Sequence, residues 1–256
     1  MDKLEYKLKK KEIKKNINEN KLKLKKIKVD YKKTKQNTNL IIENDKNQPP
    51  HLNTLEEIGN SITHGIGALF AILATILMIF KSKSSYQIAG ALIYGISMFL
   101  MFSMSSLYHA FKYGLNVKKI FRIFDYSSIY LLIGGTFAPI LLILLNNLLG
   151  LIILVCQWGI IIVGITMVAI FGPGRLKWLH FPAYFVLGWG AGMFILPTMV
   201  SKNIELLWWI LAGGISYTLG MIPFCLKGKK VAHFIWHFIV IIGVVLHFIG
   251  IYYTLY

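Results

Sequence analysis

Seven apolar segments, each about 20 residues long, follow one another along the chain from Ile58 onward. An α-helix needs about 20 apolar residues to cross the hydrocarbon core of a bilayer, where it satisfies its own backbone hydrogen bonds. The sequence therefore predicts an all-α fold, an integral membrane bundle of seven transmembrane helices. The segments are Ile58–Phe80, Gln87–Phe111, Tyr126–Leu145, Leu148–Phe171, Phe181–Val200, Leu206–Leu226 and His233–Leu255.

Charged residues are concentrated in residues 1–50, which hold 16 of the 28 lysines and arginines and seven of the 11 acidic residues. This part is rich in Lys, Asn and Ile and contains no Gly, so it cannot bury enough apolar surface to fold alone. We predict a basic, low-complexity tail over residues 1–54, disordered or transiently helical, and a membrane domain over residues 55–256. The tail could contact anionic lipid headgroups, and the alternative is a solvated tail of biased composition. No nucleic-acid partner is expected, because no folded reader accompanies the charge.

Basic residues in the connections between segments predict the orientation. The tail and the second, fourth and sixth connections carry most of the lysines and arginines, whereas the other connections carry Lys81, Lys83 and Lys202. Cytoplasmic loops hold the excess of Lys and Arg, so we expect the N-terminus in the cytoplasm and the C-terminus outside. This orientation excludes G-protein-coupled receptors and microbial rhodopsins, which place the N-terminus outside. We predict a multi-pass protein of the cell membrane, with an organelle membrane as the alternative.

Polar side chains from three segments fall at the same cytoplasmic depth in this topology. Ser105 and His109 lie near the end of the second segment, Asp125 opens the third, and His233 and His237 open the seventh. The i, i+4 spacing places each pair on one face of a helix. Three imidazoles that leave a fourth position for water are typical of a catalytic zinc site. The alternative for the last pair is packing or hydrogen bonding between helices.

The sequence predicts zinc as the cofactor, and Asp125 as a group that orients or deprotonates the bound water. The alternative for Asp125 is a helix N-cap or a partner for Arg122. His-Glu-x-x-His, Gly-x-Ser-x-Gly and phosphate-binding Gly-rich loops are absent from the sequence. A serine-triad hydrolase is therefore disfavoured.

Other polar and small residues lead to further expectations. His247 is about 15 Å from His237 along a helix axis, too far to share a metal, so we expect it to bond a neighbouring helix. His64 is expected either to line the cavity of the site or to pack between helices, and His180 to lie in a loop. Small residues at Gly188 and Gly192 predict a close approach of two helices.

Four motifs in the membrane domain resemble those of a known family. They are Glu56-Glu-Ile-Gly-Asn-Ser-Ile-Thr-His64, Ser105-Ser-Leu-Tyr-His109, Phe121-Arg-Ile-Phe-Asp125 and His233-Phe-Ile-Trp-His237. Over residues 55–256 the chain resembles the haemolysin III family, which is related to the progestin and adiponectin receptors and more distantly to alkaline ceramidases.

The resemblance implies a particular role for each polar residue. The zinc ligands would be His109, His233 and His237. Asp125 would hold or activate the zinc-bound water, and Ser105 would be a supporting hydroxyl. The tail has no counterpart in the core of the family.

The sequence is compatible with three functions. The first is a ceramidase-like, metal-dependent hydrolase that cleaves amide or ester bonds of membrane lipids. The second is a receptor or sensor in which the zinc is structural. The third is a membrane-lytic, pore-forming protein, as the family name suggests. The polar residues gather in one layer and form no stripe along a helix, which does not favour a pore.

Overall fold

The computed structural model describes residues 2–44, 46–226 and 231–256, and it divides into two compact units, Met1–Gln48 and Pro49–Tyr256. In the first unit, residues Lys3–Asn44 form the helix α1. The described side chains of α1, over residues 7–37, are all exposed. A helix that buries no apolar face depends on intrinsic propensity. The disordered or transiently helical tail therefore stays a prediction.

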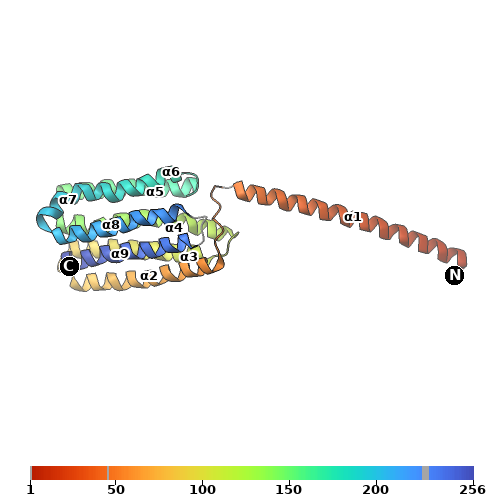
Figure 1. The fold of residues 1–256 in the computed structure, drawn as a ribbon, viewed down its shortest axis with the longest axis horizontal. Coiled ribbons are helices and arrows are strands. Elements are labelled where there is room, and N and C mark those ends of the chain that lie inside the picture. Colours follow the sequence, from red (N-terminus) through yellow and green to blue (C-terminus); the bar gives the residue numbers. More distant parts are fainter. Residues whose placement is uncertain (1, 45, 227–230) are drawn as a thin grey trace. The chain divides into compact units, whose positions relative to one another are not determined.

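The second unit contains seven helices that are long and apolar enough to cross a membrane (Figure 1). No strand occurs among the described residues. The predicted all-α, seven-helix membrane fold is thereby confirmed, and its orientation stays a prediction. The spans are α2 (Thr54–Lys81), α3 (Ser85–Ala110), α4 with η1 (Asn116–Pro139, Ile140–Leu144), α5 (Leu148–Phe171), α6 with η2 and α7 (Lys177–Phe185, Val186–Gly190, Ala191–Lys202), α8 (Ile204–Cys225) and α9 (Ala232–Leu255).

Asparagine side chains define the starts of three spans. Asn53, Asn147 and Asn203 accept hydrogen bonds from backbone N–H groups in the first turns of α2, α5 and α8. These bonds satisfy donors that the start of a helix leaves without an intrahelical acceptor. Only residues 145–147 separate η1 from α5, so the third and fourth spans are antiparallel neighbours, as expected.

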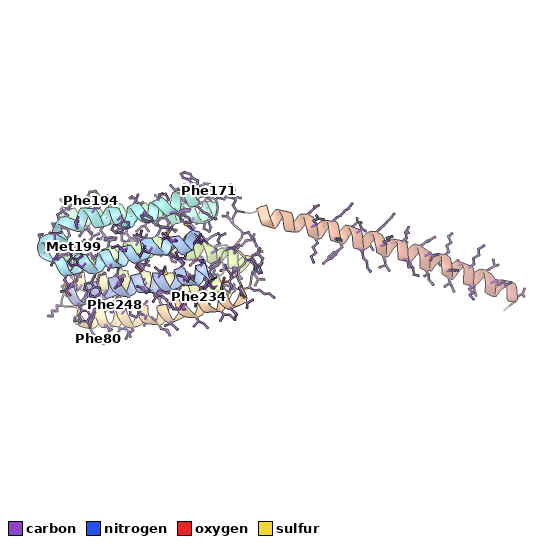
Figure 2. All side chains as sticks on the ribbon, in the orientation of Figure 1. Phe80, Phe171, Phe194, Met199, Phe234 and Phe248 are labelled. Carbon is purple, nitrogen blue, oxygen red and sulfur yellow. The ribbon has the colours of Figure 1, made fainter. Side chains whose placement is uncertain are left out.

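Neighbouring helices pack closely within the bundle. α2 packs along α3, α3 along α4 and α8 along α9, while contacts between α2 and α9 join the first span to the last. A side chain at Gly95 of α3 would collide with Thr75 of α2, so a glycine is required at this crossing. Large apolar side chains such as Phe80 and Phe194 are exposed on the outside of the bundle, where lipid replaces water (Figure 2).

The third span begins earlier than the sequence indicates. α4 starts at Asn116, well before Tyr126, because Lys118 and Arg122 are buried against the bundle and do not belong to a loop. Asp125 therefore lies inside α4, and the alternative that it is an N-cap is wrong.

The fifth span also begins earlier than predicted. α6 starts at Lys177 and includes His180, which is fully buried, with its Nδ1 3.0 Å from the hydroxyl of Tyr130 on α4. The assignment of His180 to a loop is wrong, because this hydrogen bond allows an imidazole to lie in the helix interface.

Candidate metal centre

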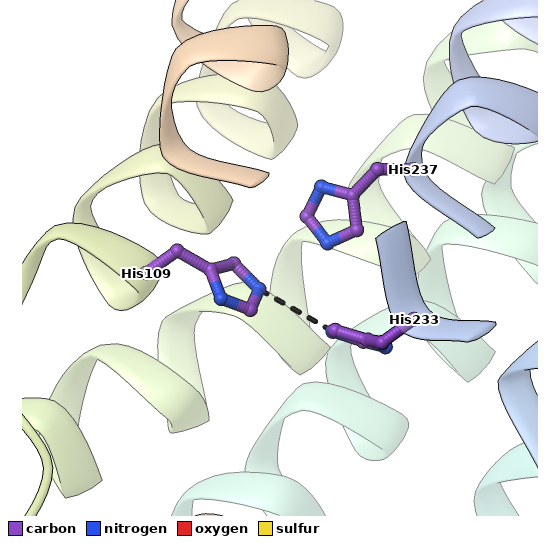
Figure 3. A group of neighbouring side chains, drawn as sticks. All are labelled: His109, His233 and His237. Carbon is purple, nitrogen blue, oxygen red and sulfur yellow. Dashed lines mark hydrogen bonds between the residues drawn. The ribbon is translucent and has the colours of Figure 1, made fainter. Parts of the chain in front are cut away.

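Three histidines from two helices meet inside one end of the bundle (Figure 3). His109 lies in the last turn of α3, and His233 and His237 lie in the first turns of α9; all three are buried. One ring nitrogen of each lies within 4.8 Å of the other two. Within the described residues, this is the only group of three or more His, Cys, Asp or Glu that could hold a metal ion.

The spacing of two ring nitrogens fits a shared metal ion. Nε2 of His109 is 3.3 Å from Nε2 of His233. Two nitrogens bound tetrahedrally to one zinc ion, at about 2.0–2.1 Å each, are themselves about 3.3 Å apart. The separation of this one pair is therefore compatible with a shared zinc ion, and it also suits a hydrogen bond between the two rings.

Glu57 determines which nitrogen of His109 carries the hydrogen. Oε2 of Glu57, in the first turn of α2, is 2.6 Å from Nδ1 of His109. An ionised carboxylate only accepts hydrogen bonds, so Nδ1 donates and Nε2 presents its lone pair toward His233. Metal-binding histidines usually donate their second nitrogen to a carboxylate or carbonyl in this way. The donor set thus fits a metal ion.

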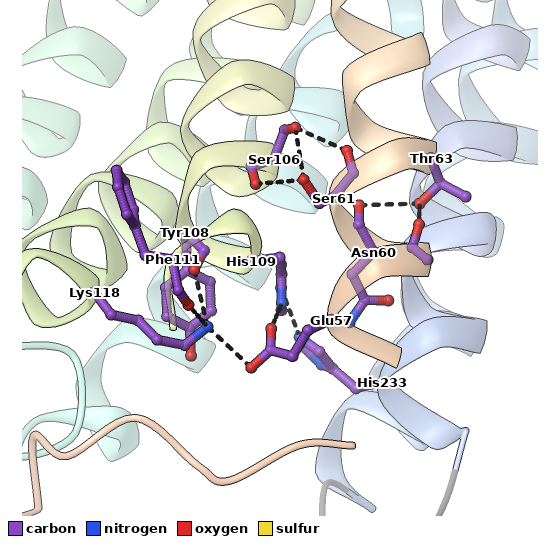
Figure 4. Close-up of polar contacts among 11 residues, drawn as sticks. Glu57, Asn60, Ser61, Thr63, Ser106, Tyr108, His109, Phe111, Lys118 and His233 are labelled. Carbon is purple, nitrogen blue, oxygen red and sulfur yellow. Dashed lines mark hydrogen bonds and ion pairs between the residues drawn. The ribbon is translucent and has the colours of Figure 1, made fainter. Parts of the chain in front are cut away.

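Lys118 extends the same network, because it forms an ion pair with Glu57 (Figure 4). This lysine lies in the first turn of α4 and is fully buried. Its Nζ lies 2.9 Å from Oε1 of Glu57 and donates to the carbonyl oxygens of Tyr108 and Phe111, at 3.0 and 2.9 Å. Neither Glu57 nor Lys118 was predicted from the sequence to be a site residue. The one signal for Glu57 was its place two turns before His64, on the same face of α2.

A cavity of about 300 Å³ extends from the histidines into the bundle. Ser105 and Asp125, the two residues predicted to act in catalysis, lie in its wall together with His233 and His237. Ser105 is buried, one turn before His109 on α3. The structure thus brings four of the five predicted side chains to one cavity wall, which His109 does not line, and the catalytic roles stay predictions. Most of the remaining wall is apolar.

Gly188 and Gly192 line this cavity and do not bring two helices together. A Cβ atom at either position would meet no other heavy atom within 4 Å among the described residues. The predicted close approach is therefore wrong. The π-helical turn η2 (Val186–Gly190) includes Gly188 and ends just before Ala191, so this part of the span departs from a regular α-helix.

Two further histidines lie in the cavity wall. The ring of His64 packs against that of His237, with centroids 3.8 Å apart, so both expected roles, lining and packing, apply to it. Nε2 of His247 is 3.1 Å from the carbonyl oxygen of Ile210 on α8. This contact confirms that His247 bonds a neighbouring helix.

Comparison with known proteins identifies the family. A model of the family described as "Haemolysin-III related" matches residues 52–248. Hemolysin-3 of Bacillus cereus is 38% identical over 191 residues, which are 73% of this chain and 86% of that protein. A hemolysin-3 homolog of Bacillus subtilis (strain 168) is 37% identical over 191 residues, 73% of this chain and 89% of that protein.

The family match covers the three histidines and nearly all of the seven-helix unit. The seven apolar helices together with these relatives make the protein a multi-pass integral membrane protein, and they support the cell membrane as its location. The chain belongs to the haemolysin-III related family.

Proposed function

We propose that the protein is a zinc-dependent hydrolase that cleaves an amide or ester bond of a membrane lipid. One observation carries this proposal: three buried imidazoles cluster together, and two of them, His233 and His237, line a largely apolar cavity whose wall also contains Asp125 and Ser105. Nitrogen ligands of this kind suit zinc. An apolar cavity inside a membrane protein suits an acyl chain.

In the proposed reaction, each group around the cavity has a separate role. A zinc ion, when bound, lowers the pKa of a coordinated water to about 7 and so supplies a nucleophile at neutral pH. Asp125 takes a proton from the attacking water and returns it to the leaving amine or alcohol. The hydroxyl of Ser105 donates a hydrogen bond to the carbonyl oxygen of the lipid. The apolar wall holds the acyl chain and excludes bulk water.

Metal analysis of purified full-length protein tests the proposal. The wild type should contain one zinc per chain, and His109→Ala, His233→Ala and His237→Ala should each lose it. These variants should also stop releasing fatty acid from ceramide-like substrates. Glu205→Gln, in the first turn of α8 and outside the cavity wall, is the control and should keep both properties.

The stability of the same variants separates a hydrolase from a receptor or sensor with a structural zinc. A hydrolase should keep its helical content and most of its thermal stability when zinc is lost. A structural zinc contributes its binding free energy to folding, so its loss should unfold the bundle. Wild-type protein that is stable, active as purified and free of zinc would contradict the zinc proposal.

The names of the relatives raise membrane lysis as a competing function. We expect no lysis, because the wall of the cavity is largely apolar and a water-filled pore requires a polar lining. Release of a dye from anionic and from neutral liposomes measures this directly. The full chain should be compared with residues 49–256, which form a compact unit of their own. Release that depends on protein dose would support lysis, and its loss without residues 1–48 would assign it to the basic tail.

A further inference from the structure

We propose that Glu57 and Lys118 form a buried positioning pair that sets the metal affinity of the centre by holding His109. The inference rests on the metal-binding part of the proposed function and does not require hydrolysis. Both are positioning residues, because they contact a candidate metal ligand or its helix and not the reacting atoms. The pair joins the first turn of α2 to the first turn of α4.

The hydrogen bonds of Lys118 fix its position. An ammonium group has three hydrogens, and three oxygens lie within 3.0 Å of Nζ: Oε1 of Glu57 and the carbonyls of Tyr108 and Phe111. The group is fully buried and also lies 4.7 Å from the centre of the Tyr108 ring. Each donor therefore has an acceptor, as a buried charge requires.

These contacts hold His109 from two directions (Figure 4). Tyr108 and Phe111 flank His109 at the end of α3, so Lys118 anchors the backbone that carries the imidazole. Glu57 holds the imidazole itself through Nδ1. One buried cation thus fixes both the helix end and the carboxylate that orients the ring.

The charge of the pair explains why both members are needed. A carboxylate on Nδ1 makes the other nitrogen of an imidazole a stronger metal ligand. An unpaired carboxylate in the interior of the protein carries a large desolvation penalty, which a neighbouring cation offsets. Lys118 therefore offsets part of the cost of burying the Glu57 carboxylate in the position where it contacts His109.

The zinc dissociation constant of the full-length protein, measured by competition with a chelator, tests this inference. Glu57→Gln keeps the size of the side chain but removes its charge, and it should weaken zinc binding about 10- to 100-fold. Glu57→Asp keeps the charge beside Lys118 but withdraws the carboxylate from His109, and it should weaken binding in the same direction. Glu205→Gln, in the first turn of α8, is the matched control and should bind as the wild type does.

A double-mutant cycle tests whether Lys118 acts through Glu57. Lys118→Met should weaken zinc binding in the wild-type background and should have a smaller effect when Glu57→Gln is already present, because only its hold on the end of α3 then remains to be lost. Residues that act through one another give non-additive effects of this kind. Fully additive losses would overturn the proposed action of Lys118 through Glu57.

The rise in melting temperature on adding zinc separates positioning from simple stabilisation. The rise depends on zinc affinity, so it should shrink in Glu57→Gln, whereas a purely structural defect would lower the zinc-free and zinc-bound melting temperatures equally. A wild type that binds no zinc would overturn the proposed metal centre itself. Wild-type zinc affinity in Glu57→Gln and Glu57→Asp would overturn the present inference alone.

Discussion

The position of Asp125 in its helix limits the roles that its carboxylate can have. It lies inside α4 and in the wall of the cavity, so its carboxylate does not cap the helix start. Asp125 does not belong to the group of three histidines that could hold a metal ion, so its contribution to catalysis should be separable from metal binding. A substitution of Asp125 can therefore distinguish a residue that holds a metal ion from one that moves a proton.

We predict that Asp125→Asn keeps zinc bound and lowers the turnover of a ceramide-like substrate about 10²- to 10⁴-fold, the usual contribution of a general base. Zinc content by metal analysis and initial rates of fatty-acid release are the two measurements. Glu205→Gln serves as the control, since Glu205 lies in the first turn of α8 and outside the cavity wall. Loss of zinc together with activity would instead place Asp125 among the metal ligands.

The sequence predicted the three histidines because two of them share a helical face and the topology places His109 at the same depth. Glu57 and Lys118 could not be found in this way. Charged residues beside an apolar segment usually belong to loops, and only the packing of α2, α3 and α4 shows that this carboxylate and ammonium are paired inside the bundle.

At the scale of helices, the fifth span differs most from its sequence interpretation. The Gly188 and Gly192 pattern normally indicates two helices in contact, yet both glycines border the cavity. The sequence predicted the existence of the seven helices, since their apolar length is enough. It led us to expect a cavity at the site, but it could not predict that Gly188 and Gly192 line this cavity, which depends on how η2 and its neighbours are placed.

We predict that Gly192→Leu partly fills the cavity and disfavours lipids with long acyl chains over short ones, by about tenfold or more in kcat/KM. The bundle should still fold, because nothing described lies within 4 Å of a Cβ at this position. Gly159→Leu is the matched control: its site is equally open, but it is exposed on α5 and away from the cavity. Equal chain-length preferences in the two variants would show that this part of the cavity does not hold the acyl chain.

Because the number of spans is odd, the start of α2 and the end of α9 lie on opposite sides of a membrane (Figure 1). The distribution of Lys and Arg then indicates which side is cytoplasmic. With the N-terminus inside, the histidine cluster lies near the cytoplasmic face. The orientation therefore decides which leaflet would supply a lipid to the site.

We predict that alkaline phosphatase fused after Tyr256 is active and that a fluorescent protein fused there is dark, because the C-terminus should lie outside. The same two reporters placed after Lys112, in the second connection, should give the opposite result. Enzyme activity and fluorescence in intact cells provide the measurement. Matching results at both positions would contradict the seven-span topology, and a reversed pattern would contradict the charge argument alone.

The long separation of the three histidines along the chain has a consequence for biosynthesis. His109 and His233 are 124 residues apart, and His233 and His237 lie on α9, the seventh of the described spans in chain order. A nascent chain that has inserted α2, α3 and α4 already contains Glu57, His109 and Lys118, but it has one of the three imidazoles. Under the proposed metal centre, all three imidazoles can hold an ion only after α9 has been synthesised and inserted, so bound zinc would mark those membrane-inserted chains in which all seven spans are in place.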